Sequence, residues 1–415
     1  MTHRSPLAAC CLVLALAACS DQPTATPARP LATAENLVPQ LDKRGAPVGL
    51  PQYAPEDVVP GHYNVVFRAD VNQRAVMAIM RNTYGVSTSH EWDEAWIHGF
   101  SAKMDDKQLD KVKRHPHVAF VNPVVRGHVS GTLYYPYNWG LDRIDQRARP
   151  LDNAYTYTDS APNVNVYVVD SGIRYTHTDF EGRAVRGIDV LTSGGTADDC
   201  NGHGTFVAAI VGGREYGVAK KARLHSVRVA NCQGGVNSND AVSAANWVTN
   251  NHRKPAVANF SVGFPQVVPE LDQAIYASIQ AGVSWVVAAG NDNADACNFT
   301  PSHTLGTITV GATDSLDSRA FFTAPRASNY GPCLNLFAPG KDLESAGILD
   351  DYDYRVDSGT SFASPHVAGI AANYLGRNPT ATPATIKSVI VNNATTGVIT
   401  NAGTGSPNRL SYSRI

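Results

Sequence analysis

Residues 131–415 contain apolar runs that alternate with helix-like segments, and this alternation constrains the fold more than any other feature of the chain. Continuous apolar strands are typical of a parallel sheet covered on both faces, and interleaved helices supply that cover. We therefore predict an α/β fold of three layers with a mostly parallel central sheet. The expected strands are 164–169, 226–230, 256–261, 283–288 and 307–311, and the expected helices lie near 203–212, 240–250, 269–281 and 361–375.

A smaller unit is predicted at residues 59–130, ahead of the domain at 131–415. Its pattern suggests the β-α-β-β-α-β order of a small α+β, ferredoxin-like domain. The segments that carry this pattern are strands at 63–67, 96–104 and 118–125 and helices at 71–84 and 106–114.

The first 19 residues have the pattern of an export signal, and residues 20–58 form a linker rich in Pro, Ala and Thr. Arg4 precedes an apolar stretch, residues 7–18, that is too short to span a membrane stably. Leu16-Ala17-Ala18-Cys19 is similar to a bacterial lipobox, in which Cys19 would carry the lipid. An ordinary secretory signal cut near the same alanines is the alternative, and either predicts an exported protein.

Composition excludes several other classes of function. The net charge of −2 gives no basic surface for nucleic acid, and the chain contains no Walker loop, His-Glu-x-x-His zinc motif or Cys-x-x-Cys pair. Three of the seven cysteines lie in the signal, so four remain in the exported part. Four cysteines allow three pairings. We expect a monomer that meets a membrane only through the possible lipid.

Ser361 lies in the segment Gly359-Thr360-Ser361-Phe362, directly before an apolar helix-like run. A serine hydroxyl needs a base to act as a nucleophile near neutral pH, and the base needs a carboxylate to orient it. His203 and Asp170 supply these groups, with Asp170 at the end of an apolar strand. Taken singly, they could be an N-cap serine, a helix-start histidine and a turn aspartate. Together they predict a catalytic triad that needs no cofactor.

Asn291 follows the apolar strand at 283–288, so its amide is expected at the carboxyl end of the sheet. Acyl transfer requires donors that face the oxyanion of the tetrahedral intermediate. The Asn291 amide and the main-chain N–H of Ser361 would supply them. A turn asparagine ahead of Asp292 is the structural alternative.

From residue 138 onward the sequence resembles the subtilisin-like serine proteases (peptidase S8), and within them the proteinase K and aqualysin branch. The order Asp…His…Ser agrees with this family. The other matching segments are residues 139–146, Ala288-Ala289-Gly290-Asn291 and residues 405–410. In the smaller domain, residues 97–103 and 117–123 resemble the inhibitor I9-type propeptide of the same proteases. The resemblance implies a subtilisin-like fold.

The resemblance also assigns roles to residues around the cleft. It implies disulfides between Cys200 and Cys232 and between Cys297 and Cys333. Exposed strand edges would bind the substrate as an added strand. Phe264-Pro265 departs from the family pattern and should narrow the cleft. The implied edges are Gly234, Gly235 and Val236 on one side and Ser261, Val262 and Gly263 on the other, while Ala288, Ala289 and Gly290 would wall a pocket for an apolar or aromatic side chain.

A calcium site is expected where acidic side chains share one helical turn, because calcium prefers oxygen ligands. A solvated acidic turn is the alternative. The candidate ligands are Asp142, Asp145, Gln146 and Asp152.

These observations predict an exported serine endopeptidase that cleaves polypeptides. Its own propeptide would assist folding and inhibit it, and would be released by self-cleavage between about Gly127 and Thr132. Two alternatives stay open. One is a non-catalytic lipoprotein that uses the same fold for binding, and the other is a hydrolase of small esters.

Overall fold

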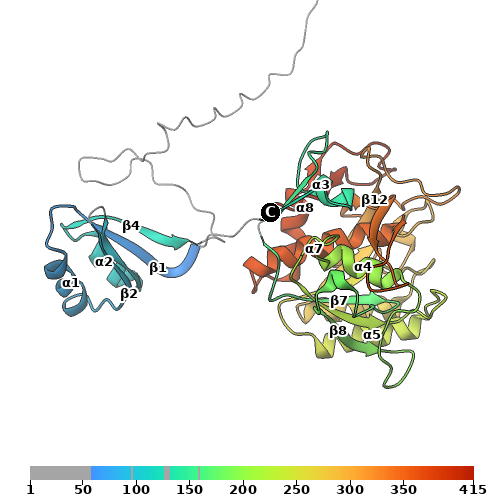
Figure 1. The fold of residues 1–415 in the computed structure, drawn as a ribbon, viewed down its shortest axis with the longest axis horizontal. Helices are drawn as coiled ribbons and strands as arrows, with labels where there is room; N and C mark the ends of the chain where they lie inside the picture. The colour runs from blue at the N-terminus through green and yellow to red at the C-terminus, as the bar shows by residue number, and fades with distance from the viewer. Residues whose placement is uncertain (1–57, 95–96, 126–130, 158) are drawn as a thin grey trace, which may run out of the picture. The chain divides into compact units, whose positions relative to one another are not determined.

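The computed structural model describes residues 58–94, 97–125, 131–157 and 159–415. The chain divides into two compact units, with the boundary after Val125 (Figure 1). Among the described residues, no helix is both long enough and apolar enough to cross a membrane. The predicted signal, Cys19 and residues 20–57 of the predicted linker lie outside the described residues, and the last linker residue, Val58, begins β1.

The first unit contains a four-stranded antiparallel sheet in the order β2-β3-β1-β4. Asn72 caps α1, and Asp105 forms a capping box with Gln108 at the start of α2, which explains where both helices begin. Met80 and Phe100 are fully buried between helices and sheet. The elements are β1 Val58–Phe67, α1 Gln73–Asn82, β2 Thr88–Glu94, β3 Ile97–Lys103, α2 Asp106–Lys113 and β4 Val118–Val125.

The second unit is built around a nine-stranded sheet in the order β16-β17-β13-β12-β11-β10-β7-β9-β8. All neighbouring pairs from β17 to β8 are parallel, and only β16 and β17 pair antiparallel. The mostly parallel sheet expected from the sequence is therefore confirmed. The strands are β7 Asn165–Asp170, β8 Ala184–Asp189, β9 Arg223–Arg228, β10 Ala256–Phe260, β11 Ser284–Ala288, β12 Ile308–Thr313, β13 Leu336–Pro339, β16 Thr395–Thr396 and β17 Arg409–Leu410.

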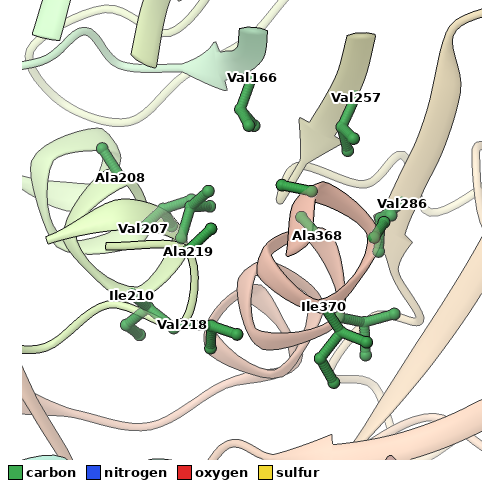
Figure 2. Close-up of a cluster of buried hydrophobic side chains, with 14 of the residues drawn as sticks. Val166, Val207, Ala208, Ile210, Val218, Ala219, Val257, Val286, Ala368 and Ile370 are labelled. Atoms are coloured by element: carbon green, nitrogen blue, oxygen red, sulfur yellow. The ribbon is translucent and has the colours of Figure 1, made fainter. Parts of the chain in front are cut away.

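Helices cover the two faces of this sheet. One layer contains α4 His203–Gly212 and α7 Thr360–Arg377, and the other contains α5 Ser238–Asn251 and α6 Pro269–Gln280. Figure 1 shows β7 with α4 on one side of it and α5 on the other. In Figure 2, Val166, Val257 and Val286 of three strands face side chains of α4 and α7.

Alternate residues of β7 enter the two cores, as the pleat of a strand requires. Val166 and Val168 pack with α4 and α7, whereas Tyr167 and Val169 pack with α5 and α6. β7 is therefore buried on both faces, and Asp170 is fixed at its carboxyl end.

Shorter elements complete the second unit. The sequence did not predict β8 or β13, and β9 begins three residues earlier than expected, because Arg223 and His225 interrupt its apolar pattern. The remaining strands and α-helices are β5 Gly131–Tyr134, α3 Trp139–Ile144, β6 Ala154–Tyr157, β14 Leu343–Ala346, β15 Tyr354–Asp357 and α8 Pro383–Asn393, and two short 3₁₀ helices lie at Thr178–Phe180 and Ala296–Asn298.

Candidate active site

Asp170 and His203 form a hydrogen-bonded pair at the carboxyl end of the sheet. Asp170 Oδ1 accepts from His203 Nδ1 at 2.7 Å and from the main-chain N–H of Ser171 at 2.8 Å. The Asp170 side chain is buried, and 27% of the His203 side chain is exposed. Since Nδ1 faces the carboxylate, Nε2 is the ring nitrogen left to act as a base.

Two opposing effects set the pKa of His203. Burial lowers it, but attraction to Asp170 and the hydrogen bond between them raise it, and the net result is a pKa above the ordinary value of 6.5. Arg355 lowers the pKa and Asp357 raises it, each by a smaller amount. The ring is therefore a stronger base than a free imidazole.

Asp199 organises the loop that presents His203, and the sequence analysis missed it. Its Oδ1 accepts from the Ser171 hydroxyl and from the main-chain N–H groups of Asn201 and Gly202. Its Oδ2 accepts both the N–H and the hydroxyl of Thr205. This carboxylate thus ties the residue after Asp170 to the first turn of α4. Its position shortly before a helix start was the signal that could have identified it.

Ser361 is the second residue of α7, and it exchanges hydrogen bonds with Ser261. The Ser361 hydroxyl donates to the Ser261 carbonyl at 2.9 Å, and the Ser261 hydroxyl donates to the Ser361 carbonyl at 2.8 Å. Pro365 explains why that second carbonyl is available: four residues later in the helix, it has no N–H to donate.

Two buried side chains support this exchange from below. Asn259 Nδ2 donates to Ser261 Oγ at 2.9 Å, and the Ser364 hydroxyl donates to Asn259 Oδ1 at 3.0 Å. Asn259 and Ser364 are fully buried. They therefore link β10 to the turn of α7 that contains Ser361. The sequence analysis did not identify either residue.

His203 lies next to the residue that follows Ser361, and within the described residues no hydrogen bond joins His203 to Ser361. The ring of Phe362, the residue after Ser361, lies 5.4 Å from the His203 ring between centroids. In this structure the Ser361 hydroxyl faces the Ser261 carbonyl. Rotation about its Cα–Cβ bond would redirect it, and catalytic hydrogen bonds are often loosely aligned before substrate binds.

Asn291 lies beside the start of α7 with its amide orientation fixed. Its Oδ1 accepts both the N–H and the hydroxyl of Thr360, each at 2.9 Å. A Cβ placed on Gly359 would lie 3.5 Å from Asn291 Nδ2, so the NH₂ group faces the turn that precedes Ser361. The NH₂ group is therefore available to an oxyanion formed at that turn.

Two cavities flank the segment 261–263, which belongs to no strand in the described part of the chain. A cavity of about 180 Å³ is lined by Asp170, His203, Gly234, Ser261 and Val262, among others. A second cavity, of about 270 Å³, is lined by a larger set, and we call it the Gly290 cavity. Its lining residues are Gly263, Phe264, Pro265, Ala288, Ala289, Gly290, Asn291, Asp292, Phe299, Ser302 and Arg326.

Most of the predicted substrate residues therefore border one of the two cavities. Gly235 and Val236 border neither, because residues 230–236 fold into a tight turn in which Asn231 Oδ1 accepts the N–H of Gly235. Their role as a substrate edge stays a prediction.

Two disulfides are present, Cys200–Cys232 and Cys297–Cys333, as the resemblance implied. Cys200 lies three residues before His203, and Asn201 Nδ2 donates to the Cys232 carbonyl. The first disulfide therefore joins the His203 loop to the turn that carries Gly234.

The predicted calcium ligands lie close together, but main-chain N–H groups occupy most of their oxygens. Asp142 accepts from Asp152 and Asn153, and Gln146 Oε1 also accepts from Asp152. Asp145 Oδ2 accepts from Thr156, and its buried Oδ1 has no partner. Within the described residues, no three His, Cys, Asp or Glu side chains are grouped to hold a metal ion. Calcium binding stays a prediction.

Comparison with known proteins agrees with this geometry. A model of the subtilase family matches residues 161–412, and a model of the peptidase inhibitor I9 family matches residues 70–125. An extracellular serine proteinase of Thermus sp. (strain Rt41A) is 42% identical, over 96% of this chain and 97% of the relative. Alkaline serine exoprotease A of Vibrio alginolyticus is 37% identical, over 98% of this chain and 77% of the relative.

A solved structure is similar as well. The crystal structure of a cold adapted subtilisin-like serine proteinase matches with a TM-score of 0.63 and 44% identity, over 67% of this chain and 98% of that one. The chain therefore belongs to the subtilase family of serine endopeptidases and carries a peptidase inhibitor I9 domain ahead of its catalytic domain.

Proposed function

We propose that this secreted endopeptidase hydrolyses peptide bonds through Asp170, His203 and Ser361, with Asn291 in the oxyanion hole. The observation that carries the proposal is the 2.7 Å bond between Asp170 and His203 Nδ1. It leaves Nε2 free to receive a proton from Ser361, the second residue of α7.

In the proposed reaction, these residues act as follows. His203 Nε2 takes the Ser361 proton as Oγ attacks the peptide carbonyl carbon, and Asn291 Nδ2 and the Ser361 N–H stabilise the resulting oxyanion. Collapse of the intermediate breaks the C–N bond while His203 protonates the leaving amine. Water then repeats the sequence on the acyl-enzyme, releasing the acid and restoring the hydroxyl.

The Gly290 cavity is proposed as the pocket for the side chain that precedes the scissile bond, the P1 residue. It adjoins Asn291, whose amide would contact the carbonyl oxygen of that same residue. Ala288, Ala289 and Gly290 leave room for apolar or aromatic side chains, and Phe264 and Pro265 narrow the pocket on the other side.

The I9 domain acts as an intramolecular inhibitor in this family, and we propose that it is released by self-cleavage. The proposed cut, between Gly127 and Thr132, lies mostly outside the described residues, although Gly131 and Thr132 belong to β5. If Cys19 carries a lipid, the same cut frees the catalytic domain from the membrane. Catalytic domain that still sediments with membranes after complete processing would contradict this release.

The test compares the parent protein with Ser361→Ala and, as a matched control, Ser358→Ala. Intact mass after expression should show a trimmed parent and control, and a Ser361→Ala variant that retains its propeptide. A fluorophosphonate should label the parent at Ser361 alone. A non-catalytic lipoprotein would show neither processing nor labelling, and a hydrolase restricted to esters would be labelled but leave casein intact.

A further inference from the structure

Residues 321–327 form a short hairpin beside the Gly290 cavity, and we call it the 321–327 hairpin. Phe321 and Ala327 pair as an isolated bridge, and the main-chain N–H of Phe322 donates to the Arg326 carbonyl at 3.0 Å. Ala327 also pairs with Asp292, which borders the cavity. These contacts fix the backbone of Arg326 next to the cavity wall.

A buried arginine braces this hairpin. The Arg319 guanidinium donates to the carbonyl of Ser328 and to Asn293 Oδ1, and it lies 4.9 Å from the centre of the Phe321 ring. Because Arg319 contacts both ends of the hairpin and the segment that follows Asp292, the hairpin is held as part of the cavity wall.

Arg326 is a cationic residue of the cavity wall whose charge is not paired with another described residue. Arg326 is exposed and is one of the residues that line the cavity, and within the described residues its guanidinium has neither an ion pair nor a hydrogen bond. Arg143 provides a contrast, because its guanidinium is fully buried and holds Asp317 through two hydrogen bonds. The Arg326 guanidinium can therefore meet a ligand without first breaking a protein contact.

We propose that Arg326 is a specificity-determining residue that allows the P1 pocket to accept carboxylate side chains. The inference rests on the proposed role of the Gly290 cavity and adds a substrate class to the apolar one. A guanidinium presents a planar set of donors that matches a carboxylate, and the contact is strengthened where the substrate side chain displaces water. A P1 glutamate is the side chain that would use this contact.

Asp292 acts in the opposite direction. Asp292 lines the same cavity, and a Cβ placed on Gly290, another lining residue, would lie 3.4 Å from Asp292 Oδ2. Within the described residues, Asp292 and Arg326 form no ion pair. Removing the Asp292 charge should therefore favour a P1 carboxylate, and removing the Arg326 charge should disfavour it.

The experiment uses peptide p-nitroanilides that differ only at P1, with Glu, its neutral isostere Gln, or Phe. The measured quantity is kcat/KM for the Glu peptide divided by kcat/KM for the Gln peptide. Arg326→Ala and Arg326→Gln should each lower this ratio about three- to fivefold, the range of an exposed ion pair, and Asp292→Asn should raise it by a similar factor. Addition of 0.5 M NaCl should lower the ratio in the parent, because salt screens exposed charges.

Arg186→Ala is the matched control, because it removes the same charge from a residue that borders neither cavity. An unchanged ratio in both Arg326 variants, or an equal fall in Arg186→Ala, would overturn the proposal. Failure of the proposed function would look different, because the parent would then leave the Phe peptide uncleaved and Ser361 unlabelled.

Discussion

Thr360 donates both its main-chain N–H and its hydroxyl to Asn291 Oδ1, so one residue fixes the amide of the other. The Thr360 hydroxyl in turn accepts the N–H of Gly290, one residue before Asn291. The amide oxygen is thereby held on the Thr360 side, and the NH₂ group has a single orientation toward the reaction centre.

Removal of the Thr360 hydroxyl should therefore weaken catalysis without weakening binding of the substrate. We expect Thr360→Val to lower kcat about tenfold, the effect of losing one hydrogen bond that positions a donor, with little change in KM. Thr360→Ser keeps the hydroxyl and should retain kcat. Asn291→Ala should lower kcat by about 10²–10³, as is typical for loss of an oxyanion donor. Steady-state kinetics on one peptide checks all three, and a Thr360→Val loss confined to KM would contradict the account.

Replacement of Asp199 should disturb the base rather than the nucleophile. Asp199→Ala leaves donors of Ser171, Asn201, Gly202 and Thr205 without their acceptor, so we expect kcat to fall at least tenfold and the free energy of unfolding to fall by about 3 kcal/mol or more. The neighbouring exposed residue provides the control, Asp198→Ala, which should change neither. If calorimetry and kinetics gave Asp199→Ala and Asp198→Ala the same stability and the same kcat, the proposed role of Asp199 would be wrong.

The pH dependence of kcat/KM should report the pKa of His203. Because Asp170 raises this pKa above 6.5 and only the neutral ring can accept the serine proton, activity should rise with pH through a midpoint above 6.5. Asp170→Asn removes the attraction and leaves the burial that lowers the pKa. Its midpoint should move to lower pH while kcat falls by up to about 10⁴. A midpoint that does not move in Asp170→Asn would contradict this assignment.

His366 should make the catalytic domain sensitive to acid. It is fully buried, accepts from Asn138 Nδ2 at Nε2 and donates from Nδ1 to the Phe362 carbonyl, so the folded state requires the neutral ring. Burial lowers the pKa of His366 to about 4 from 6.5. Between these values the unfolded chain binds a proton that the folded chain does not. Stability should therefore fall by about 3 kcal/mol as the pH drops from about 6.5 to about 4.

Denaturant unfolding at several pH values tests this, with the enzyme blocked at Ser361 to prevent self-digestion. His366→Gln should flatten the slope of stability against pH in that window, whatever its absolute stability. Burial also lowers the pKa of His225 to about 4, so part of the slope should remain until His225 is replaced as well. An unchanged slope in His366→Gln would show that its titration is not coupled to folding.

The catalytic domain should resist peroxide. All four methionines lie at or before residue 104, and the four cysteines of the domain are paired in disulfides. Phe362 follows Ser361, and the centroid of its ring lies 4.4 Å from that of Phe206. A methionine at this apolar position would become a polar sulfoxide on oxidation and disturb the packing. We expect the parent and Phe362→Leu to keep their activity in millimolar peroxide and Phe362→Met to lose it. Equal rates of inactivation by peroxide in the parent and in Phe362→Met would refute this.

The proposed catalytic residues could be found in the sequence because each one lies at or near the end of a recognisable element. Asp170 ends β7 and Asn291 lies three residues after β11, whereas His203 is the first residue of α4 and Ser361 the second residue of α7. Their supports could not be found in the same way. Asp199, Asn259 and Ser364 are ordinary polar residues in isolation, and their importance arises from contacts between segments that are distant in sequence.

The same limit applies to the fold. Continuous apolar strands such as β7 and β11 were predicted, whereas Arg186 and Gly187 interrupt the apolar pattern of β8 and β13 has only four residues. The place of the 321–327 hairpin beside the Gly290 cavity depends on Asp292 and Arg319, and no local pattern contains that information.

The burial of β7 on both faces has a consequence for how this enzyme tolerates change. Both helical layers pack against the strand that ends in Asp170, so a change of side-chain volume in either layer would shift the same carboxylate. Substitutions in the two helical layers should therefore compensate for one another through β7, although the layers lie on opposite faces of the sheet.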